Sequence, residues 1–275
     1  MDHYLDAAIE IAREAGQVLL AHRGVGFELK GEHDLVTAAD RASEQLIIKE
    51  LKKRFPQHGI VAEEGGRAEM HAELRWYVDP LDGTTNFAHG FPMWNVTMAL
   101  AKNDEVIAGV VYDPLNRELF AAERGGGARL NGAPIHVSKA RVLNDSLVAT
   151  GFPSRRRHLN VNIHFYYQLA MLTHGVRRGG SAAIDLAYTA CGRLEAFWEF
   201  GLNPWDMAAG TLLVEEAGGK ASGMRGEKLD VHGIYLVADN GLIHEEMLGV
   251  FDEVFDGRYR HDMPALPAKE WTRRG

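Results

Sequence analysis

Two aspartates three positions apart, Asp79 and Asp82, follow a short apolar run that begins at Trp76. The segment that contains them, residues 76–87, reads Trp-Tyr-Val-Asp-Pro-Leu-Asp-Gly-Thr-Thr-Asn-Phe. Carboxylates that follow a buried strand are hard oxygen ligands, which Mg²⁺ prefers, and Mg²⁺ often binds together with substrate phosphates. Gly83 lets the N–H groups of the following turn approach an anion closely. The segment therefore predicts a metal-assisted phosphate site whose remaining ligands lie elsewhere in the chain.

Two further carboxylates stand at the ends of predicted elements. Glu63 follows a buried strand predicted at residues 60–62. Asp206 lies in the first turn of a helix predicted over residues 203–217, because an Asn-Pro pair supplies an N-cap residue and a suitable first helical residue. Elements that share a sheet edge can bring such carboxylates to one pocket. A metal-assisted phosphate hydrolase also needs a poised water and donors for the phosphate oxygens, and Thr84 is the nearest hydroxyl that could orient that water.

Each of these residues also has a purely structural explanation. Glu63 suits a solvent-exposed turn, Asp206 suits a helix cap, and Thr84 suits a strand or cap position. Thr37 and Asp40 have the spacing of a capping box, which does not exclude a second role for Asp40. The combination of all these positions, rather than any one of them, indicates chemistry.

Composition limits the classes of protein to which this chain can belong. Its 275 residues, 46% of them hydrophobic, suffice for one large domain or two tightly joined halves. The formal net charge of −8 gives no general electrostatic reason to bind DNA or RNA. Cys191 is the one cysteine, which excludes an intrachain disulfide. No apolar run approaches the roughly 18 residues of a membrane span, and the first residues lack signal-peptide order, so we expect a cytoplasmic protein outside the membrane.

Hydrophobic periodicity predicts two helices and then a largely antiparallel meander in the first half. The expected helices cover residues 4–21 and 37–55, and the expected strands cover residues 59–62, 76–78, 96–101, 106–112, 119–122, 128–129 and 135–137. In the second half, strands alternate with helices, which favours a partly parallel sheet. These strands cover residues 146–150, 175–178, 194–198 and 235–239, and the helices cover residues 158–173, 181–190, 203–217 and 242–255. We expect one α/β (α+β) domain over residues 1–275, with halves 1–143 and 144–255 sharing a cleft, and a polar tail over 256–275.

At this point the chain resembles a known family. Residues 79–86 (Asp-Pro-Leu-Asp-Gly-Thr-Thr-Asn) and 205–210 (Trp-Asp-Met-Ala-Ala-Gly) are similar to the two signature motifs of the inositol monophosphatase family. The similarity also includes residues 34–40, 62–64 and 180–183. It implies the layered αβαβα sandwich of the Mg²⁺-dependent, Li⁺-sensitive phosphatases, with an antiparallel first sheet, a mixed second sheet and a homodimeric assembly.

The resemblance also implies a role for each matched residue. Two or three Mg²⁺ ions would be held by Glu63, Asp79, the carbonyl of Leu81, Asp82 and Asp206. The catalytic residues would be Thr84 and Asp40, which orient the attacking water, with Glu63 and Asp82. The substrate would contact Glu63, Leu81, Asp82, Gly83, Thr84, Gly180, Ser181, Ala182, Glu199 and Asp206. Lys30 would lie on a mobile loop near the metals, and Arg177 would have a structural or interfacial role.

The reaction that the resemblance implies is hydrolysis of inositol monophosphate by direct attack of a metal-activated water. An aspartyl-phosphate mechanism would need an acid two positions after the nucleophile, whereas Asp82 stands three positions after Asp79. Relatives also act on fructose 1,6-bisphosphate, histidinol phosphate or 3′-phosphoadenosine nucleotides. Glu199 favours a polyol ring, but the fold does not fix the substrate.

Other signals in the sequence are weaker. The glycines at residues 125–127 lack the trailing Lys-Ser/Thr of a phosphate loop and predict a flexible turn. The histidines form no His-Glu-x-x-His pattern and are expected to be scattered over the surface. Some bacterial proteins similar to this one act as partners of the transcription antitermination machinery. The basic run at residues 154–158 is where such binding would be sought here, although it equally suits a solvated helix start.

Overall fold

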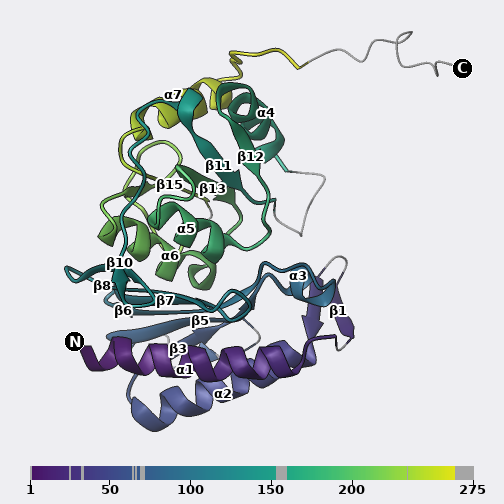
Figure 1. Cartoon of the computed structure of the whole chain (residues 1–275), viewed down its shortest axis with the longest axis vertical. Helices are drawn as coiled ribbons and strands as arrows, with labels where there is room; N and C mark the ends of the chain where they lie inside the picture. The colour runs from purple at the N-terminus through teal and green to yellow at the C-terminus, as the bar shows by residue number, and fades with distance from the viewer. Residues whose placement is uncertain are drawn as a thin grey trace, which may run out of the picture.

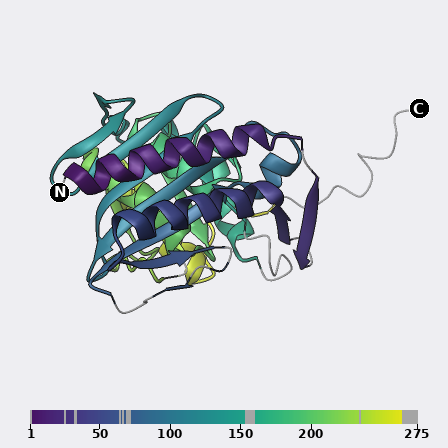
Figure 2. The same cartoon turned by 90° about the horizontal axis from the view of Figure 1, so that it is seen from below.

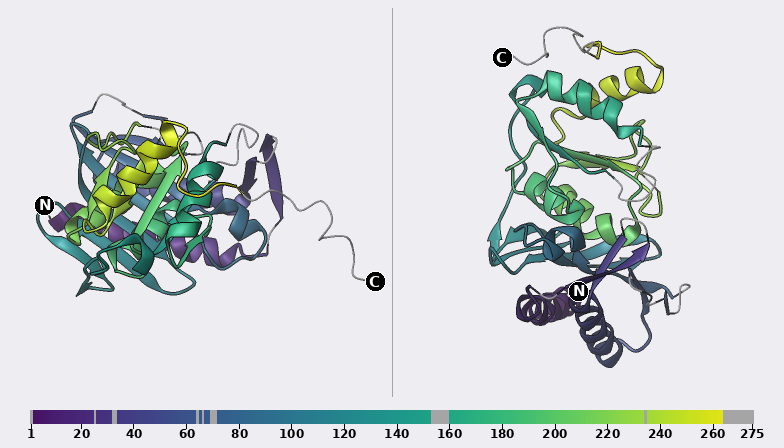
Figure 3. Two further views of the ribbon diagram at one scale, coloured as in Figure 1. Left: turned by 90° about the horizontal axis from the view of Figure 1, so that it is seen from above. Right: turned by 90° about the vertical axis from the view of Figure 1, so that its right-hand side faces the viewer.

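Layers of helices and sheets alternate through the molecule, as Figure 1 and the right-hand view of Figure 3 show. The computed structural model describes residues 2–24, 26–31, 34–63, 65, 67–68, 72–152, 160–233 and 235–263. The helices are α1 (Asp2–Ala21), α2 (Ala38–Arg54), α3 (Thr84–Ala88), α4 (Asn162–Leu172), α5 (Ala182–Ala190), α6 (Pro204–Glu216) and α7 (His244–Phe255). α1 and α2 cover the first sheet, α5 and α6 separate the two sheets, and α4 and α7 cover the second sheet. The predicted αβαβα sandwich is confirmed.

The first sheet has the strand order β10-β9-β8-β7-β6-β5-β3-β4. Its strands are β3 (Gly59–Ala62), β4 (Arg67–Ala68), β5 (Leu74–Asp82), β6 (Asn95–Lys102), β7 (Glu105–Asp113), β8 (Glu118–Glu123), β9 (Gly127–Leu130) and β10 (Ala133–Pro134). Neighbouring strands are antiparallel except β3 and β5, which are parallel. Ala62 pairs with Val78, and the Glu63 N–H donates to the Val78 carbonyl at 3.2 Å. This parallel pairing places Glu63 next to Asp79, just beyond the carboxyl-terminal end of β3.

β5 extends through the two aspartates, so the expectation of a strand ending at residue 78 is wrong. Asp79 pairs with Thr97 and Asp82 pairs with Asn95 on β6, so three steps along β5 match two along β6. The additional residue makes a β-bulge, a feature that locally redirects side chains. The bulge thus lets both aspartates of one strand contribute to the same site.

α1 and α2 lie beside each other across the outer face of the first sheet (Figure 2). Buried side chains of α1 recur at helical spacing, with Ile11, Ala15 and Leu19 fully buried. α2 begins with the predicted capping box: the Thr37 N–H donates to Asp40 Oδ2 at 2.7 Å, and Thr37 Oγ1 accepts from backbone N–H groups of the first turn. This cap fixes Asp40 at the start of α2. The hairpin of β1 (Phe27–Gly31) and β2 (Asp34–Thr37) precedes it.

The second sheet has the strand order β12-β11-β13-β15-β14. Its strands are β11 (Leu147–Thr150), β12 (Gly175–Arg177), β13 (Ala196–Phe200), β14 (Lys220–Ser222) and β15 (Tyr235–Asp239). β11 is parallel to β12 and β13, whereas β15 is antiparallel to β13 and β14, which gives the mixed sheet that was predicted. α6 packs closely against the first sheet because small residues meet there: a Cβ on Gly109 of β7 would lie 2.9 Å from the Ala209 Cα.

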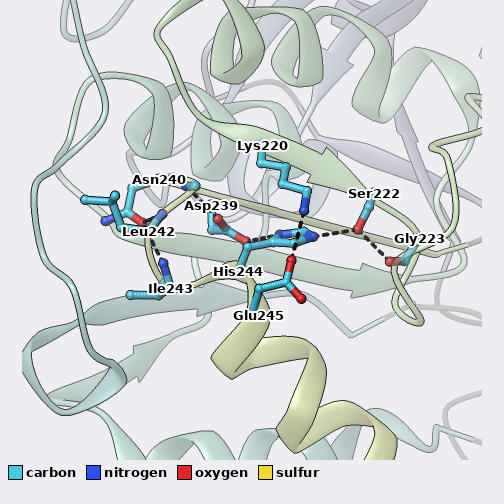
Figure 4. Close-up of polar contacts among 10 residues, drawn as sticks. Lys220, Ser222, Gly223, Asp239, Asn240, Leu242, Ile243, His244 and Glu245 are labelled. Atoms are coloured by element: carbon cyan, nitrogen blue, oxygen red, sulfur yellow. Dashed lines mark hydrogen bonds and ion pairs between the residues drawn. The ribbon is translucent and has the colours of Figure 1, made fainter.

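A buried polar cluster fastens α7 to the second sheet (Figure 4). His244 Nδ1 lies 2.6 Å from Asp239 Oδ2, and His244 Nε2 lies 3.2 Å from Ser222 Oγ. His244 is 1% exposed, so the expectation that the histidines are scattered over the surface is wrong for this residue. A buried polar group needs hydrogen-bond partners, and β14 and β15 supply them here. Asn240 extends the cluster to the chain segment between the sheets by donating to the Ala140 carbonyl at 2.8 Å.

Several short elements differ from the predictions. β4, β14 and the 3₁₀ turn at Leu143–Asp145 were not predicted, nor was α3, which follows directly after β5. The strand expected at residues 135–137 is wrong, since the pairing with β9 is made by Ala133 and Pro134. The glycines at 125–127 do form a turn, and the N–H groups of Gly125 and Gly127 donate to the Glu216 carboxylate. In the part of the chain described, no helix is long and apolar enough to cross a membrane.

Candidate active site

Asp79 and Asp82 are both buried at the end of β5, with exposed fractions of 2% and 8%. Asp79 Oδ1 accepts a hydrogen bond from the Leu81 N–H at 3.0 Å. Asp82 Oδ2 accepts from Asn95 Nδ2 at 3.0 Å, from Ser181 Oγ and from a backbone N–H of α5. Asp82 therefore connects the first sheet to the N-terminus of α5, whose helix dipole also favours a negative charge.

Gly83 turns the chain from β5 into α3. Its φ of 89° lies in the left-handed region, and a Cβ at this position would lie 2.8 Å from the Met93 carbonyl oxygen. Both the backbone conformation and the close approach therefore require glycine. The turn brings Thr84, the first residue of α3, directly beside the aspartates.

Thr84 is joined to Asp40 across the site. Thr84 Oγ1 donates toward Asp40 Oδ1 and toward the Leu81 carbonyl, each at 3.0 Å. Asp40 is fully buried, and burial raises its carboxyl pKa, although hydrogen bonds from Thr37 and Thr84 oppose that shift. Because the single hydroxyl hydrogen points at these acceptors, the lone pairs of Thr84 Oγ1 remain suited to accept a hydrogen bond from water.

Asp206 and Glu199 bring carboxylates from the second half of the chain. Asp206 is in the first turn of α6, where its Oδ2 accepts from the Asn203 N–H at 2.7 Å. Burial raises the pKa of Asp206 to about 7, and the nearby charge of Asp82 adds to this shift. Glu199 lies on β13, and its carboxyl group packs against Gly151, where a Cβ would lie 2.0 Å from Glu199 Oε2. Burial, followed by the charge of Asp206, holds the pKa of Glu199 well above its usual range.

The carboxylates that follow β3, end β5 and begin α6 lie close enough for their charges to shift one another's pKa. The pKa of Asp79 is raised well above its usual range by burial and then by the charges of Glu63, Asp82 and Asp206. Among the described residues, no three acidic, histidine or cysteine side chains already form a closed group of metal ligands. The donor chemistry nevertheless fits Mg²⁺, because carboxylates that raise one another's pKa are stabilised as anions by a divalent cation, and hard oxygens are its preferred ligands.

The turn before α5 contacts Asp82 through Ser181. Gly180 has a φ of +85°, and the carbonyl of Gly179 accepts from Asn86 Nδ2 at 2.9 Å. Ser181 then caps α5, because its Oγ accepts from the Ile184 N–H at 3.3 Å while donating to Asp82. Gly180, Ser181 and Ala182, which were predicted to contact substrate, are thus held next to Asp82.

Several residues that support the site were not predicted from the sequence. Asn86 and Asn95 tie the turn and the aspartates to the second half, and Ser43 Oγ donates to the Pro80 carbonyl at 2.8 Å. Asp185 is 2% exposed within α5, and burial followed by the charge of Asp82 raises its pKa well above the usual range. Asn95 and Asp185 are polar residues inside largely apolar segments, a signal that could have identified them, whereas Asn86 and Ser43 stand among other polar residues and give no such signal.

The remaining predicted residues lie away from this cluster or outside the described part of the structure. Lys30 belongs to β1, but its side chain lies outside the described part of the structure, as does the basic run at residues 154–158. Arg177 is the exposed last residue of β12. Asp239, His244 and Ser222 lie in the order of a catalytic triad. However, the Ser222 hydroxyl donates to the Gly223 carbonyl at 2.8 Å, and all three side chains are buried. That arrangement is structural, because a nucleophile must be accessible to its substrate.

Comparison with known proteins gives consistent results. The model of the inositol monophosphatase family matches residues 1–254. An inositol-1-monophosphatase of Synechocystis is 45% identical over 89% of this chain and 87% of that protein. A Nus factor SuhB of Pseudomonas aeruginosa is 42% identical over 87% of this chain and 92% of that protein. The structure of an inositol monophosphatase from Anabaena is similar with a TM-score of 0.84 and 43% identity, covering 90% of this chain and 94% of that chain.

Proposed function

Because this chain belongs to the inositol monophosphatase family and is a phosphatase, we propose that it hydrolyses inositol monophosphate to inositol and phosphate with Mg²⁺. The observation that carries this proposal is the convergence of carboxylates from both halves beside the Thr84–Asp40 pair. Relatives that are 42–45% identical include proteins named inositol-1-monophosphatase, which supports the choice of substrate.

The carboxylates and one carbonyl would hold the cations. Glu63, Asp79 and the Leu81 carbonyl would form one group of ligands, and Asp79, Asp82 and Asp206 would form the other. When bound, two or three Mg²⁺ ions would offset the charge of the phosphate and acidify the attacking water. The hydrogen bonds to Oδ2 of Asp82 and of Asp206 would fix both carboxylates in orientation, as outer-shell partners do at metal sites.

Thr84 and Asp40 would orient the attacking water. The Thr84 hydroxyl donates to Asp40, so its oxygen would accept a hydrogen bond from the water and direct a lone pair of that water toward phosphorus. Asp40 would stabilise the proton as it moves onto this pair, because burial raises the pKa of its carboxyl group. Glu63 and Asp82 would assist through the cations that they hold. The phosphate oxygens would meet the N–H groups of Gly83 and Thr84.

The substrate's alcohol would lie against the second half of the molecule. Glu199 is held beside Asp206 and would accept hydrogen bonds from ring hydroxyls, while Gly180, Ser181 and Ala182 would supply backbone contacts. A carboxyl group suits a polyol because each hydroxyl is a donor that the carboxylate can accept. A substrate without hydroxyl groups should therefore lose binding at this side of the site.

A substrate panel tests the proposal. Phosphate release would be measured with myo-inositol 1-phosphate, fructose 1,6-bisphosphate, histidinol phosphate and 3′-phosphoadenosine 5′-phosphate, each with Mg²⁺, with EDTA and with added Li⁺. The proposal predicts the highest kcat/KM for inositol 1-phosphate, loss of activity in EDTA and inhibition by Li⁺. A higher kcat/KM for another of these phosphates would keep the chemistry and replace the substrate. The absence of turnover with all four would refute the proposed reaction.

A second candidate function concerns transcription. Relatives named Nus factor SuhB are 40–44% identical to this chain, which favours a partner role beside catalysis. The basic residues Arg155, Arg156 and Arg157 would be the first to test. Replacing all three by alanine should abolish binding to RNA polymerase or RNA while leaving phosphate release unchanged. Equal binding by the triple variant would remove this surface from consideration.

Assembly and location stay predictions. A homodimer is expected from the family, and light scattering of the purified protein would give a mass of about twice the 30.4 kDa chain. A monomeric mass at micromolar concentration would contradict it. A cytoplasmic location is expected from the composition, and cell fractionation would test it. The division of the chain into halves near residue 143 is likewise a prediction, which limited proteolysis would examine.

A further inference from the structure

Glu199 lies at a junction between two parallel strands of the second sheet. Thr150, the last residue of β11, pairs with Trp198 on β13, and the next residues are Gly151 and Glu199. A Cβ at Gly151 would lie 2.0 Å from one Glu199 oxygen and 2.1 Å from its carboxyl carbon, so a side chain there would displace the Glu199 carboxyl group. The Glu199 carboxyl group therefore packs directly against the Gly151 backbone.

Asn162, the first residue of α4, holds this junction together. Its Nδ2 donates to Thr150 Oγ1 at 2.8 Å and to the Gly151 carbonyl at 2.7 Å. Its Oδ1 accepts from Trp198 Nε1 at 2.7 Å. Thr150 Oγ1 closes the ring by donating to the Trp198 carbonyl at 2.6 Å. These side chains are fully buried, so water cannot replace a lost partner easily.

Donor and acceptor chemistry leaves this network a single arrangement. The indole N–H of Trp198 can only donate, so it must face the oxygen of the Asn162 amide, and the amide nitrogen must then face Thr150 and Gly151. The amide thus uses both of its N–H groups and its oxygen. A fully satisfied buried network of this kind fixes the positions of the segments that it joins.

We propose that Asn162 is a positioning residue that, by joining Gly151 to Trp198, fixes the Gly151 backbone against the Glu199 carboxylate and thereby sets the preference for polyol phosphates. The inference rests on the proposed function, in which Glu199 accepts hydrogen bonds from the ring hydroxyls. Asn162 does not itself touch the substrate. Its effect reaches the alcohol side of the site and leaves the carboxylates around Thr84 unchanged.

The test compares two substrates in Asn162→Ala. Inositol 1-phosphate carries ring hydroxyls, whereas phenyl phosphate carries none. A misplacement of about 1 Å at a binding group can change rates by up to about 100-fold. We expect kcat/KM for inositol 1-phosphate to fall about 10-fold, mainly through KM, and kcat/KM for phenyl phosphate to change less than about 2-fold. Equal changes for both substrates would overturn the proposal.

Gln168→Ala is the matched control, because it removes the same number of hydrogen bonds from the same helix. Gln168 Oε1 accepts from the N–H groups of Arg260 and His261 at 2.9 and 3.0 Å, and its Nε2 donates to the His261 carbonyl at 2.7 Å. We expect both variants to lower Tm by a similar amount and only Asn162→Ala to change the substrate ratio. A changed ratio in Gln168→Ala would show that loosening α4 in general is sufficient, which contradicts a specific role for Asn162.

A double-mutant cycle connects the network to its target. Glu199→Gln should reduce kcat/KM for inositol 1-phosphate, and Asn162→Ala should add little in the Glu199→Gln background, because the group that it positions is already altered. Independent, multiplicative effects would contradict the proposal.

The indole N–H resonance of Trp198, assigned with Trp198→Phe, supplies a readout that needs no substrate. It should be protected from solvent exchange in the wild type and lose protection in Asn162→Ala. If inositol 1-phosphate is not a substrate at all, the proposed function fails, whereas unchanged exchange protection refutes the positioning role by itself.

Discussion

Replacing Gly83 by alanine should damage the turn that presents Thr84 to the aspartates. The wild-type φ of 89° is unfavourable for an alanine, and the new Cβ would lie 2.8 Å from the Met93 carbonyl oxygen and 3.2 Å from the Trp94 Cα. Both of these neighbouring atoms belong to the backbone, so they cannot rotate away as the end of a flexible side chain could. The chain must therefore shift at the turn, at the point where β5 enters α3.

The expected size of the effect follows from these two contributions. The left-handed backbone conformation costs an alanine about 1–2 kcal/mol. The close approach to backbone adds about 1–3 kcal/mol, as overpacking does elsewhere. We therefore expect Gly83→Ala to lower the free energy of unfolding by about 1.5–4.5 kcal/mol, after a gain of about 0.5 kcal/mol from the stiffer unfolded chain.

Gly90→Ala separates the two contributions. Gly90 has a φ of +70°, and no atom lies within 4 Å of its added Cβ, so this variant carries the conformational penalty alone. Urea unfolding followed by circular dichroism would measure both variants. We expect Gly83→Ala to be less stable than Gly90→Ala by about 1–3 kcal/mol, and phosphate release to fall only in Gly83→Ala. Equal stabilities would refute the reasoning that backbone crowding at Gly83 defines the turn.

Three further predictions concern the site and the fold. Thr84→Val should lower kcat about 100-fold because it removes the hydroxyl that faces Asp40, while Thr85→Val on the exposed side of the turn should stay within about 2-fold in the same phosphate assay. Since the pKa of Asp206 is raised to about 7 in the folded protein, its folded state keeps a proton that the unfolded state releases at lower pH. The free energy of unfolding of the metal-free protein therefore falls as the pH rises through 7. Without metal, Asp206→Asn should therefore raise Tm more at pH 8 than at pH 5, and an equal gain at both would contradict this. His244→Ala should lower the free energy of unfolding by about 2–4 kcal/mol in urea without changing KM, because Asp239 Oδ2 stays buried and loses its hydrogen-bond partner.

Much of the fold could be predicted because long elements carry a clear periodicity. α1, α2, α6 and α7 begin and end within a few residues of the predicted bounds. β4 and β14, at two and three residues, are too short to show any period, and α3 is a single short helix within a motif dominated by polar residues. The end of β5 was misplaced because its proline and carboxylates are typical of a turn, whereas a bulge accommodates them within the strand.

The candidate ligands could be chosen from residue type and spacing, but their supports could not. Asp82 accepts a hydrogen bond from Ser181, 99 positions later in the chain, and no local pattern reports such a contact. Asn95 and Asn162 likewise act through long-range hydrogen bonds, to Ser181 and Trp198 respectively, that depend on how distant elements pack together. His244 was misjudged for the same reason, since its burial depends on β14 and β15 rather than on its neighbours in sequence.

One measurement tests the proposed active site most directly: Mg²⁺-dependent phosphate release from inositol 1-phosphate by the wild type and by Asp206→Asn. Asparagine keeps the shape of the side chain and its hydrogen-bond acceptor toward Asn203 but removes the charge. We expect turnover by the wild type that EDTA abolishes, and a loss of more than about 100-fold in the variant, which exceeds the usual effect of an outer-shell change. A variant that keeps the wild-type rate, or a wild type that is equally active in EDTA, would contradict a metal site built from both halves of the chain.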